Sequence, residues 1–171
     1  MARRSLAVVA AAGALAACGG AGGGSDASSS FLAFSSTFAS FRTWTSFDSP
    51  GPADDGTFPA DVLGPRTQYI NTVPRHGATE FAVGTVIVES RASGKIFAGV
   101  KRGGDFNATG AANWEWFELT DAPVTIVWRG VGPPIGDTYG GDPNGGCNAC
   151  HARCGLSNDY VCSPRLALGS F

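Results

Sequence analysis

The sequence predicts a mainly β domain of the α+β class: a small antiparallel sheet with an N-terminal helix and one short helical turn near the C-terminal end. Segments rich in β-branched and aromatic residues recur between short turns in the second half of the chain, as in an antiparallel meander. Glycine is unusually frequent, with 25 residues in 171, which favours a turn-rich β protein over a helical bundle. An aromatic stripe near the N-terminus recurs every three or four residues, which predicts a helix.

Each element follows from its local composition. Residues 31–47 carry the aromatic stripe, so we expect a helix that packs this face on the core. Residues 48–65 are rich in Pro, Gly and Asp and predict a loop, as do residues 130–146. Strands are expected over residues 67–73, 81–89, 95–101, 113–120 and 123–129. A short helical turn is expected at residues 147–151, and an irregular segment at 158–171 ends the chain.

Residues 1–17 have the features of a signal peptide. Two arginines precede an apolar run of 12 residues, which is too short to span a bilayer as a helix but fits the core of a signal peptide. The run ends in Leu15-Ala16-Ala17-Cys18, which resembles the bacterial lipobox and implies cleavage before a diacylated Cys18. Several acyl chains suffice for stable membrane anchoring. An ordinary signal peptide, cut after Ala-x-Ala, is the alternative.

Residues 18–30 are mostly Gly and Ser, which predicts a flexible tether between the lipid anchor and one folded domain of residues 31–171. Gly19 stands where the inner-membrane retention signal of enteric bacteria has Asp, so we expect the outer membrane, facing the periplasm. The formal net charge is −2 and no block of Lys or Arg occurs, which excludes nucleic acid as a partner.

The chain has five cysteines, and each has a candidate use. Cys18 is assigned to the lipid, and Cys147 and Cys150 are separated by two residues. Cys154 and Cys162 remain as a pair. Because an exported protein lies where disulfides persist, we expect these two to be bonded to each other.

Residues 147–151 (CNACH) form a CxxCH motif, which is typical of covalent haem attachment. Two residues between Cys147 and Cys150 allow both thiols to add to the vinyl groups on one edge of haem. His151, directly after the second cysteine, can then bind the iron. We therefore expect haem c, with its iron, as the cofactor.

Two other interpretations of these cysteines stay open. Cys147, Cys150, Cys154 and Cys162 contain enough thiols for a tetrahedral zinc site, although the second pair lacks the usual close spacing and an oxidising compartment disfavours four free thiolates. Alternatively, the four cysteines form two structural disulfides and His151 has no role. In both cases the protein is a non-haem binding module.

Few residues are available for the other side of a haem iron. The sole methionine, Met1, leaves with the signal peptide, which excludes His/Met ligation within the mature chain. His76 is the only other histidine and is a candidate sixth ligand; an exposed loop histidine is the alternative. With His76 bound, the protein would be an electron-transfer cytochrome. Without it, the haem is five-coordinate, with an open face for a small molecule.

Four segments together resemble the cytochrome P-460 and cytochrome c′-beta family. They are FAVGTVIVE at 81–89, GVKRG at 99–103, WEWF at 114–117, and CNACH at 147–151 with DYV at 159–161. The resemblance implies a small antiparallel β domain, usually a homodimer, with His151 as the proximal ligand and an open distal pocket. Some members oxidise hydroxylamine and others bind nitric oxide, so an enzyme and a protein that only binds the gas both stay open. The partners implied are a small ligand, nitric oxide or hydroxylamine, and a redox partner cytochrome.

The resemblance also raises the question of a lysine cross-link to the haem, which the hydroxylamine-oxidising members carry. Members commonly have lysine directly before the glutamate of the GTVxVxE stretch, where this chain has Val88. If that is the cross-linking position, the bond cannot form here. Lys101, in the next strand, is the substitute candidate.

Other polar and aromatic residues have paired interpretations. Glu89 and Glu115 are candidate distal proton acceptors, because oxidation of an N–O substrate releases protons; the alternative is that they face water from a two-faced strand. Trp114 and Trp116 are expected on one strand face, in the core or at the haem edge. Tyr160, near the motif, is a candidate partner for a haem propionate.

Overall fold

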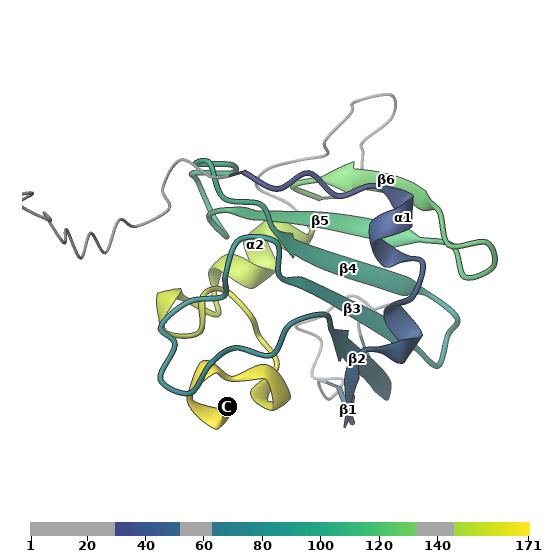
Figure 1. Ribbon diagram of the computed structural model, residues 1–171, viewed down its shortest axis with the longest axis horizontal. Helices are drawn as coiled ribbons and strands as arrows, with labels where there is room; N and C mark the ends of the chain where they lie inside the picture. Colours follow the sequence, from purple (N-terminus) through teal and green to yellow (C-terminus); the bar gives the residue numbers. More distant parts are fainter. Residues whose placement is uncertain (1–29, 52–62, 133–145) are drawn as a thin grey trace, which may run out of the picture.

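A computed structural model describes residues 30–51, 63–132 and 146–171. Six strands form one antiparallel sheet, in which the order in space follows the order in the chain (Figure 1). The strands are β1 (Thr45–Ser49), β2 (Arg66–Ile70), β3 (Val86–Arg91), β4 (Ile96–Lys101), β5 (Trp114–Leu119) and β6 (Ile126–Gly130). The predicted mainly β fold and its antiparallel meander are therefore confirmed.

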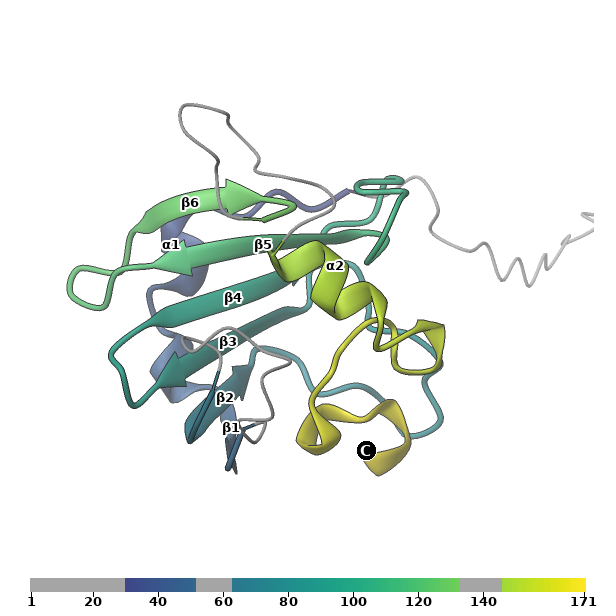
Figure 2. The ribbon, with the colours of Figure 1, turned by 180° about the vertical axis from the view of Figure 1, so that it is seen from behind.

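The helical elements are short. They are α1 (Ser35–Phe38), η1 (Phe41–Thr43), α2 (Gly146–Ala152), η3 (Leu156–Asn158), η4 (Pro164–Leu166) and η5 (Leu168–Ser170). Comparison of the two opposite views shows α1 on one face of the sheet and α2 on the other (Figures 1 and 2). The expected helical turn at the CxxCH motif is α2.

The alternation of side chains along the strands divides the core in two. Val86 and Val88 of β3 point to the face covered by α1 and η1, where they pack with Phe38 and Phe41. On the other face, Trp114 and Trp116 belong to a second cluster with the C-terminal segment, whose buried members include Val161, Leu166 and Leu168. The expectation that Trp114 and Trp116 share one face is confirmed, with Phe117 in the first cluster.

The helix expected over residues 31–47 is wrong in extent. Its aromatic face is real, since Phe38 and Phe41 are buried, but only one turn of α-helix and one of 3-10 helix form. Side-chain contacts accompany both short turns: Thr37 Oγ1 accepts from Phe34 N at 3.0 Å and caps the start of α1, and Thr43 Oγ1 donates to Ser40 O at 2.8 Å in η1. The end of the expected helix is instead the edge strand β1, paired with β2.

The strand expected over residues 81–89 begins later than predicted. Gly84 has a φ of +89°, and Thr85 N donates to Ala82 O at 2.9 Å, so this stretch is a turn that only Gly accommodates easily. The extended run starts at Val86, where the backbone leaves the turn and joins β4.

Several predictions fall outside the described residues. These are the signal peptide, the lipidated Cys18, the tether apart from Ser30, and most of the loop at 130–146. Within residues 30–51, 63–132 and 146–171, no helix has both the length and the apolar character needed to cross a membrane.

Candidate functional site

A cavity of about 360 Å³ lies between the sheet and the segment that carries α2. This volume is within the range of roughly 300–1,000 Å³ typical of small-molecule sites. Its apolar walls are Ile87, Phe97, Trp116, Val161 and Leu166. Its polar lining among the described residues is Arg66, Gln68, Glu89, Arg91, His151 and Ser163. The cavity is thus mainly apolar with one strongly polar end.

Helix α2 brings the CxxCH motif to this cavity. Cys147, Cys150 and His151 all line it, and both cysteines are partly buried and outside any disulfide bond. Cys147 also packs against the second hydrophobic cluster. Two thiols and one imidazole from a single helical turn therefore face one enclosed space.

Asn148, inside the motif, fixes α2 to the loop before β5. Its Oδ1 accepts from Ala111 N at 2.9 Å and from Asn107 Nδ2 at 2.6 Å, while its Nδ2 donates to Thr109 O at 3.0 Å. The side chain is 1% exposed. A fully used amide at this depth sets the position of the helix, because each lost partner would leave a buried polar group unsatisfied.

Two contacts hold the His151 ring: a hydrogen bond at Nδ1 and a stacking contact on its face. Its Nδ1 hydrogen bonds to the backbone carbonyl of Tyr160 at 2.8 Å, which fixes Nδ1 as the donor. Its ring stacks on Trp116, with centroids 3.9 Å apart and planes 28° apart. The other ring nitrogen, Nε2, is then the unprotonated one, with its lone pair free for a metal ion.

Burial lowers the pKa of His151 below its usual value of 6.5, because desolvation disfavours the charged imidazolium; the bond to the Tyr160 carbonyl opposes this in part. A lowered pKa keeps the imidazole neutral at physiological pH. Neutral imidazole is the form that binds metal ions.

The carbonyl that holds His151 comes from an unusual backbone. Asp159 and Tyr160 both have positive φ angles, of 47° and 63°, in the left-handed region that non-glycine residues rarely adopt. Tyr160 N donates to Gly155 O at 2.9 Å, which closes the turn. The predicted role of Tyr160 concerned its hydroxyl, whereas the contact in the structure is made by its main chain.

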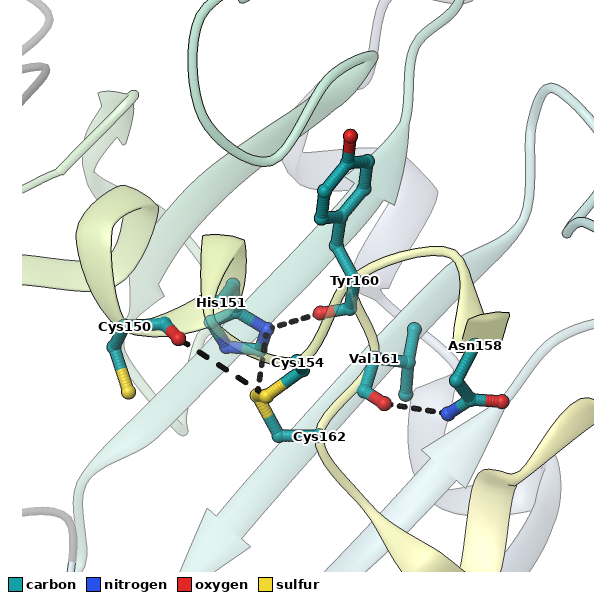
Figure 3. The surroundings of a disulfide bond; sticks show 7 residues. All are labelled: Cys150, His151, Cys154, Asn158, Tyr160, Val161 and Cys162. Carbon is teal, nitrogen blue, oxygen red and sulfur yellow. Dashed lines mark hydrogen bonds between the residues drawn. A yellow bond between two sulfur atoms is a disulfide. The ribbon is translucent and has the colours of Figure 1, made fainter. Parts of the chain in front are cut away.

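The expected disulfide between Cys154 and Cys162 is confirmed, with an S–S distance of 1.94 Å. It closes the segment that contains Tyr160, and Cys162 Sγ lies 3.6 Å from His151 Nδ1 (Figure 3). The bond uses two of the four thiols that a zinc site would need. Among the described residues, no group of three or more His, Cys, Asp or Glu side chains is arranged to hold a metal ion.

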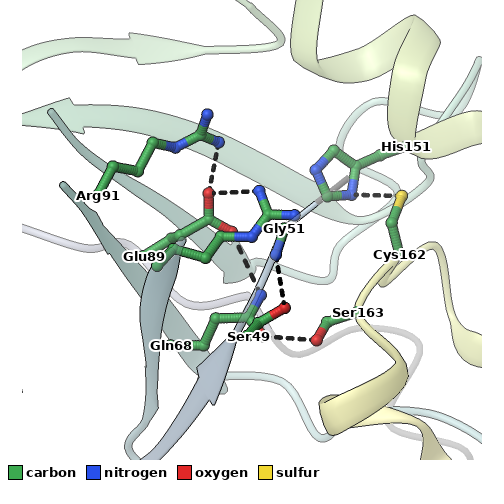
Figure 4. Close-up of polar contacts among 9 residues, drawn as sticks. Ser49, Gly51, Gln68, Glu89, Arg91, His151, Cys162 and Ser163 are labelled. Carbon is green, nitrogen blue, oxygen red and sulfur yellow. Dashed lines mark hydrogen bonds and ion pairs between the residues drawn. The ribbon is translucent and has the colours of Figure 1, made fainter. Parts of the chain in front are cut away.

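Glu89 lies at the polar end of the cavity, inside a cluster of hydrogen-bond donors. Arg66 Nη1 contacts its Oε1 at 3.0 Å, Gln68 Nε2 contacts its Oε2 at 3.2 Å, and Arg91 forms a third contact. Figure 4 shows this cluster on the sheet, with His151 opposite it on α2. The two side chains with acid–base chemistry, Glu89 and His151, therefore line the same space from opposite walls.

Three other predicted site residues lie away from the cavity. Glu115 is on the opposite face of the sheet, 2% exposed, where its carboxylate binds Arg129 at 2.7 Å and Arg102 at 3.2 Å. His76 is exposed in the loop after β2 and is not part of the cavity lining. Lys101 is buried beside Asp159 and also does not line the cavity.

Val88 does not line the cavity. Val88 is 0% exposed and belongs to the cluster beneath α1, on the face away from His151. Its neighbours Ile87 and Glu89 line the cavity, together with Arg91 of the same strand. The side chain at position 88 therefore points away from the cavity.

The site residues that sequence reasoning missed are Asn148, Arg66, Arg91 and the main-chain carbonyl of Tyr160. A polar residue between two motif cysteines gives no signal of burial by itself. Arg66 and Arg91 lie opposite each other on β2 and β3, beside the pair of Gln68 and Glu89. Two like charges at one cross-strand position need a nearby carboxylate, and this signal could have found them.

Comparisons with known proteins add no further assignment. Neither the family models, nor the curated proteins, nor the solved structures gave a match.

Proposed function

We propose that this protein is a c-type cytochrome in which Cys147 and Cys150 carry the thioether bonds of one haem and His151 binds its iron. One observation carries the proposal: two cysteine side chains outside any disulfide and a neutral imidazole, all from α2, line a single cavity, and the Nδ1 contact of the imidazole leaves Nε2 for a metal.

The surrounding residues fit a haem. The donor set has the spacing and residue types that covalent attachment requires, and most of the cavity wall is aromatic or aliphatic, as suits a flat apolar macrocycle. The indole Nε1 of Trp116 is buried without a hydrogen-bond partner among the described residues. A donor beside the cavity with no protein partner leaves a hydrogen bond for a bound group to accept. Bound haem supplies an iron centre that holds a small ligand and exchanges electrons.

We assign the open side of the haem to a small nitrogen oxide, such as nitric oxide or hydroxylamine. This assignment rests on the resemblance and on the ligands within reach: His76 is exposed and outside the cavity, which supports a five-coordinate iron. Glu89 is the one carboxylate among the described cavity residues, so it is the candidate proton acceptor if the ligand is oxidised. The His/His electron-transfer cytochrome has less support.

The same proposal includes export and lipid attachment through Cys18, which would place the haem domain in the periplasm at the outer membrane. A periplasmic position agrees with the disulfide between Cys154 and Cys162, because such bonds persist in oxidising compartments. A soluble cytochrome is then the expected redox partner.

The first test is spectroscopic. Protein made together with a cytochrome c maturation system should give a pyridine haemochrome spectrum, and Cys147→Ser with Cys150→Ser should abolish it. His76→Ala is the matched control, since the proposal predicts an unchanged, high-spin ferric spectrum. A change from low spin to high spin in this variant would show that His76 binds the iron.

The second test addresses the ligand. The ferrous protein should bind nitric oxide, and Glu89→Gln should leave this binding unchanged, because a neutral gas needs no proton acceptor. If the protein oxidises hydroxylamine, the same variant should lower kcat by about 10²–10⁴-fold, the usual contribution of a positioned base. Equal turnover in Glu89→Gln and wild type would remove Glu89 from the reaction.

A further inference from the structure

Lys101 and Asp159 form an ion pair inside the protein, beside the segment that holds His151. Lys101 Nζ lies 2.5 Å from Asp159 Oδ1, and each residue is 4% exposed. Asp159 Oδ2 also accepts from Phe81 N at 2.9 Å. The carboxylate is thus fixed through both oxygens to the sheet and to the turn before β3.

This anchoring acts on the residue that holds His151. Asp159 precedes Tyr160, and both have the left-handed backbone that non-glycine residues adopt only when their surroundings impose it. The carbonyl of Tyr160, which this backbone aims at α2, accepts from His151 Nδ1 at 2.8 Å. The residue in the buried ion pair, Asp159, therefore directly precedes the residue whose carbonyl binds the imidazole.

A second series of contacts connects the same residues. The ammonium of Lys101 lies 5.6 Å from the ring centre of Trp114, which stacks on Trp116 with centroids 5.9 Å apart. Trp116 in turn stacks on His151 at 3.9 Å. The ion pair is thus connected to both supports of the imidazole: through the Asp159–Tyr160 backbone to the carbonyl that binds Nδ1, and through Trp114 to the Trp116 ring beneath the imidazole.

We propose that Lys101 and Asp159 are positioning residues for His151, which set the strength of its Nδ1 hydrogen bond and thereby the electron donation of its Nε2 to a metal. The consequence for iron rests on the proposed haem function. A stronger Nδ1 hydrogen bond gives the imidazole more anionic character and makes it a stronger donor. Lys101, the candidate for a covalent cross-link on sequence grounds, instead serves as the counter-ion of Asp159.

A buried ion pair needs such an explanation, because burial removes two charges from water and the pair alone is weak evidence for stability. What the pair does provide is a single geometry. Asp159 accepts one charged and one neutral donor in fixed directions, so the left-handed turn has one preferred orientation.

The test changes the charge and keeps the shape. Asp159→Asn retains an oxygen that can accept from Phe81 N but loses the charge that holds Lys101. In the haem-loaded protein, this variant should lower the iron–histidine stretching frequency in the resonance Raman spectrum of the ferrous state and raise the midpoint potential. The double variant Lys101→Met with Asp159→Asn removes both charges, avoids an unpaired buried ammonium and should shift both quantities in the same direction.

Glu118→Gln is the matched control. It breaks the ion pair between Glu118 of β5 and Lys95, the residue before β4. The Lys95 side chain is 50% exposed, and the pair does not touch the His151 segment. This control should leave the frequency and the potential at their wild-type values. Unchanged values in both Asp159 variants, with haem attached and the fold intact, would overturn the proposal.

A separate measurement covers a protein that carries no haem, which would refute the proposed function but not the positioning role. Nitrogen-15 spectra of the imidazole should then show the proton of His151 on Nδ1 in the wild type. Both Asp159 variants should shift part of the population to the other tautomer. Identical tautomer populations in all of these proteins would overturn the positioning role itself.

Discussion

Gly99 is the position where the sheet makes room for the tryptophan that supports His151. It lies opposite Trp116 on the neighbouring strand, and a Cβ built on it would be 2.7 Å from Trp116 Cζ3 and 3.2 Å from Cε3. Carbon atoms prefer separations of about 3.5–4.0 Å, so Gly99→Ala must displace the indole. Because Trp116 stacks on His151, the displacement should reach the site.

Two opposing contributions set the expected magnitude. Alanine in place of a glycine within a strand stabilises by about 0.5–1 kcal/mol, whereas an extra carbon forced into a packed core costs about 1–3 kcal/mol. The free energy of unfolding should therefore fall by about 1 kcal/mol, and by no more than about 2.5 kcal/mol. Urea unfolding measures it as a lower midpoint with an unchanged m-value.

The control places the same substitution in a Trp116→Phe background, where the contacting indole atoms are absent. There the glycine-to-alanine change should be neutral or stabilising, and the difference between the two backgrounds is the coupling energy of the contact. If Gly99→Ala alone stabilises the protein by the full strand contribution of about 0.5–1 kcal/mol, the close approach of Trp116 to Gly99 is refuted.

Three further predictions follow from the same region. Asn148→Ala leaves buried partners on the loop before β5 unsatisfied and should cost about 1–3 kcal/mol in urea unfolding, with an unaltered stability contradicting its role as an anchor. Replacing Cys154 and Cys162 together with serine should lower the free energy of unfolding by about 2–3 kcal/mol, because the bond closes a loop with a sequence separation of 8. Mild reduction of the wild type should lower it by the same amount. His151 has a lowered pKa in the folded haem-free protein, so that state binds fewer protons than the unfolded chain. The free energy of unfolding should be highest above a pH of about 6.5 and decline as the pH falls from there toward the lower pKa of folded His151. A His151→Gln variant with the same decline would show that His151 does not cause it.

The sheet could be predicted because the composition of each short segment indicates a strand without reference to distant residues. Each strand from β2 to β6 is a short run of β-branched and aromatic residues between turn residues, and antiparallel neighbours need only short connections. The disulfide could be predicted by elimination among few cysteines. The extent of the N-terminal helix could not be predicted, because the aromatic spacing shows which residues face the core but not where a cap starts the helix or where pairing with β2 replaces it.

Some residues of the candidate site could also be predicted from the sequence, and others depend on the tertiary structure. The CxxCH spacing identifies three residues of one helical turn, and the structure brings all three to one cavity. Glu89 and Glu115 are equivalent by sequence, yet strand register places one in the cavity and the other in an ion-pair cluster behind the sheet. The Tyr160 carbonyl has no sequence signal, because its direction depends on a left-handed backbone that tertiary contacts impose.

The central claim is that Cys147 and Cys150 hold a covalent haem. The most direct measurement is the mass of the proteolytic peptide that contains residues 147–151, from protein made with a cytochrome c maturation system. One haem should be added to this peptide and none to the peptide with the disulfide cysteines. A peptide with two unmodified thiols, or with a bond between Cys147 and Cys150, would contradict it.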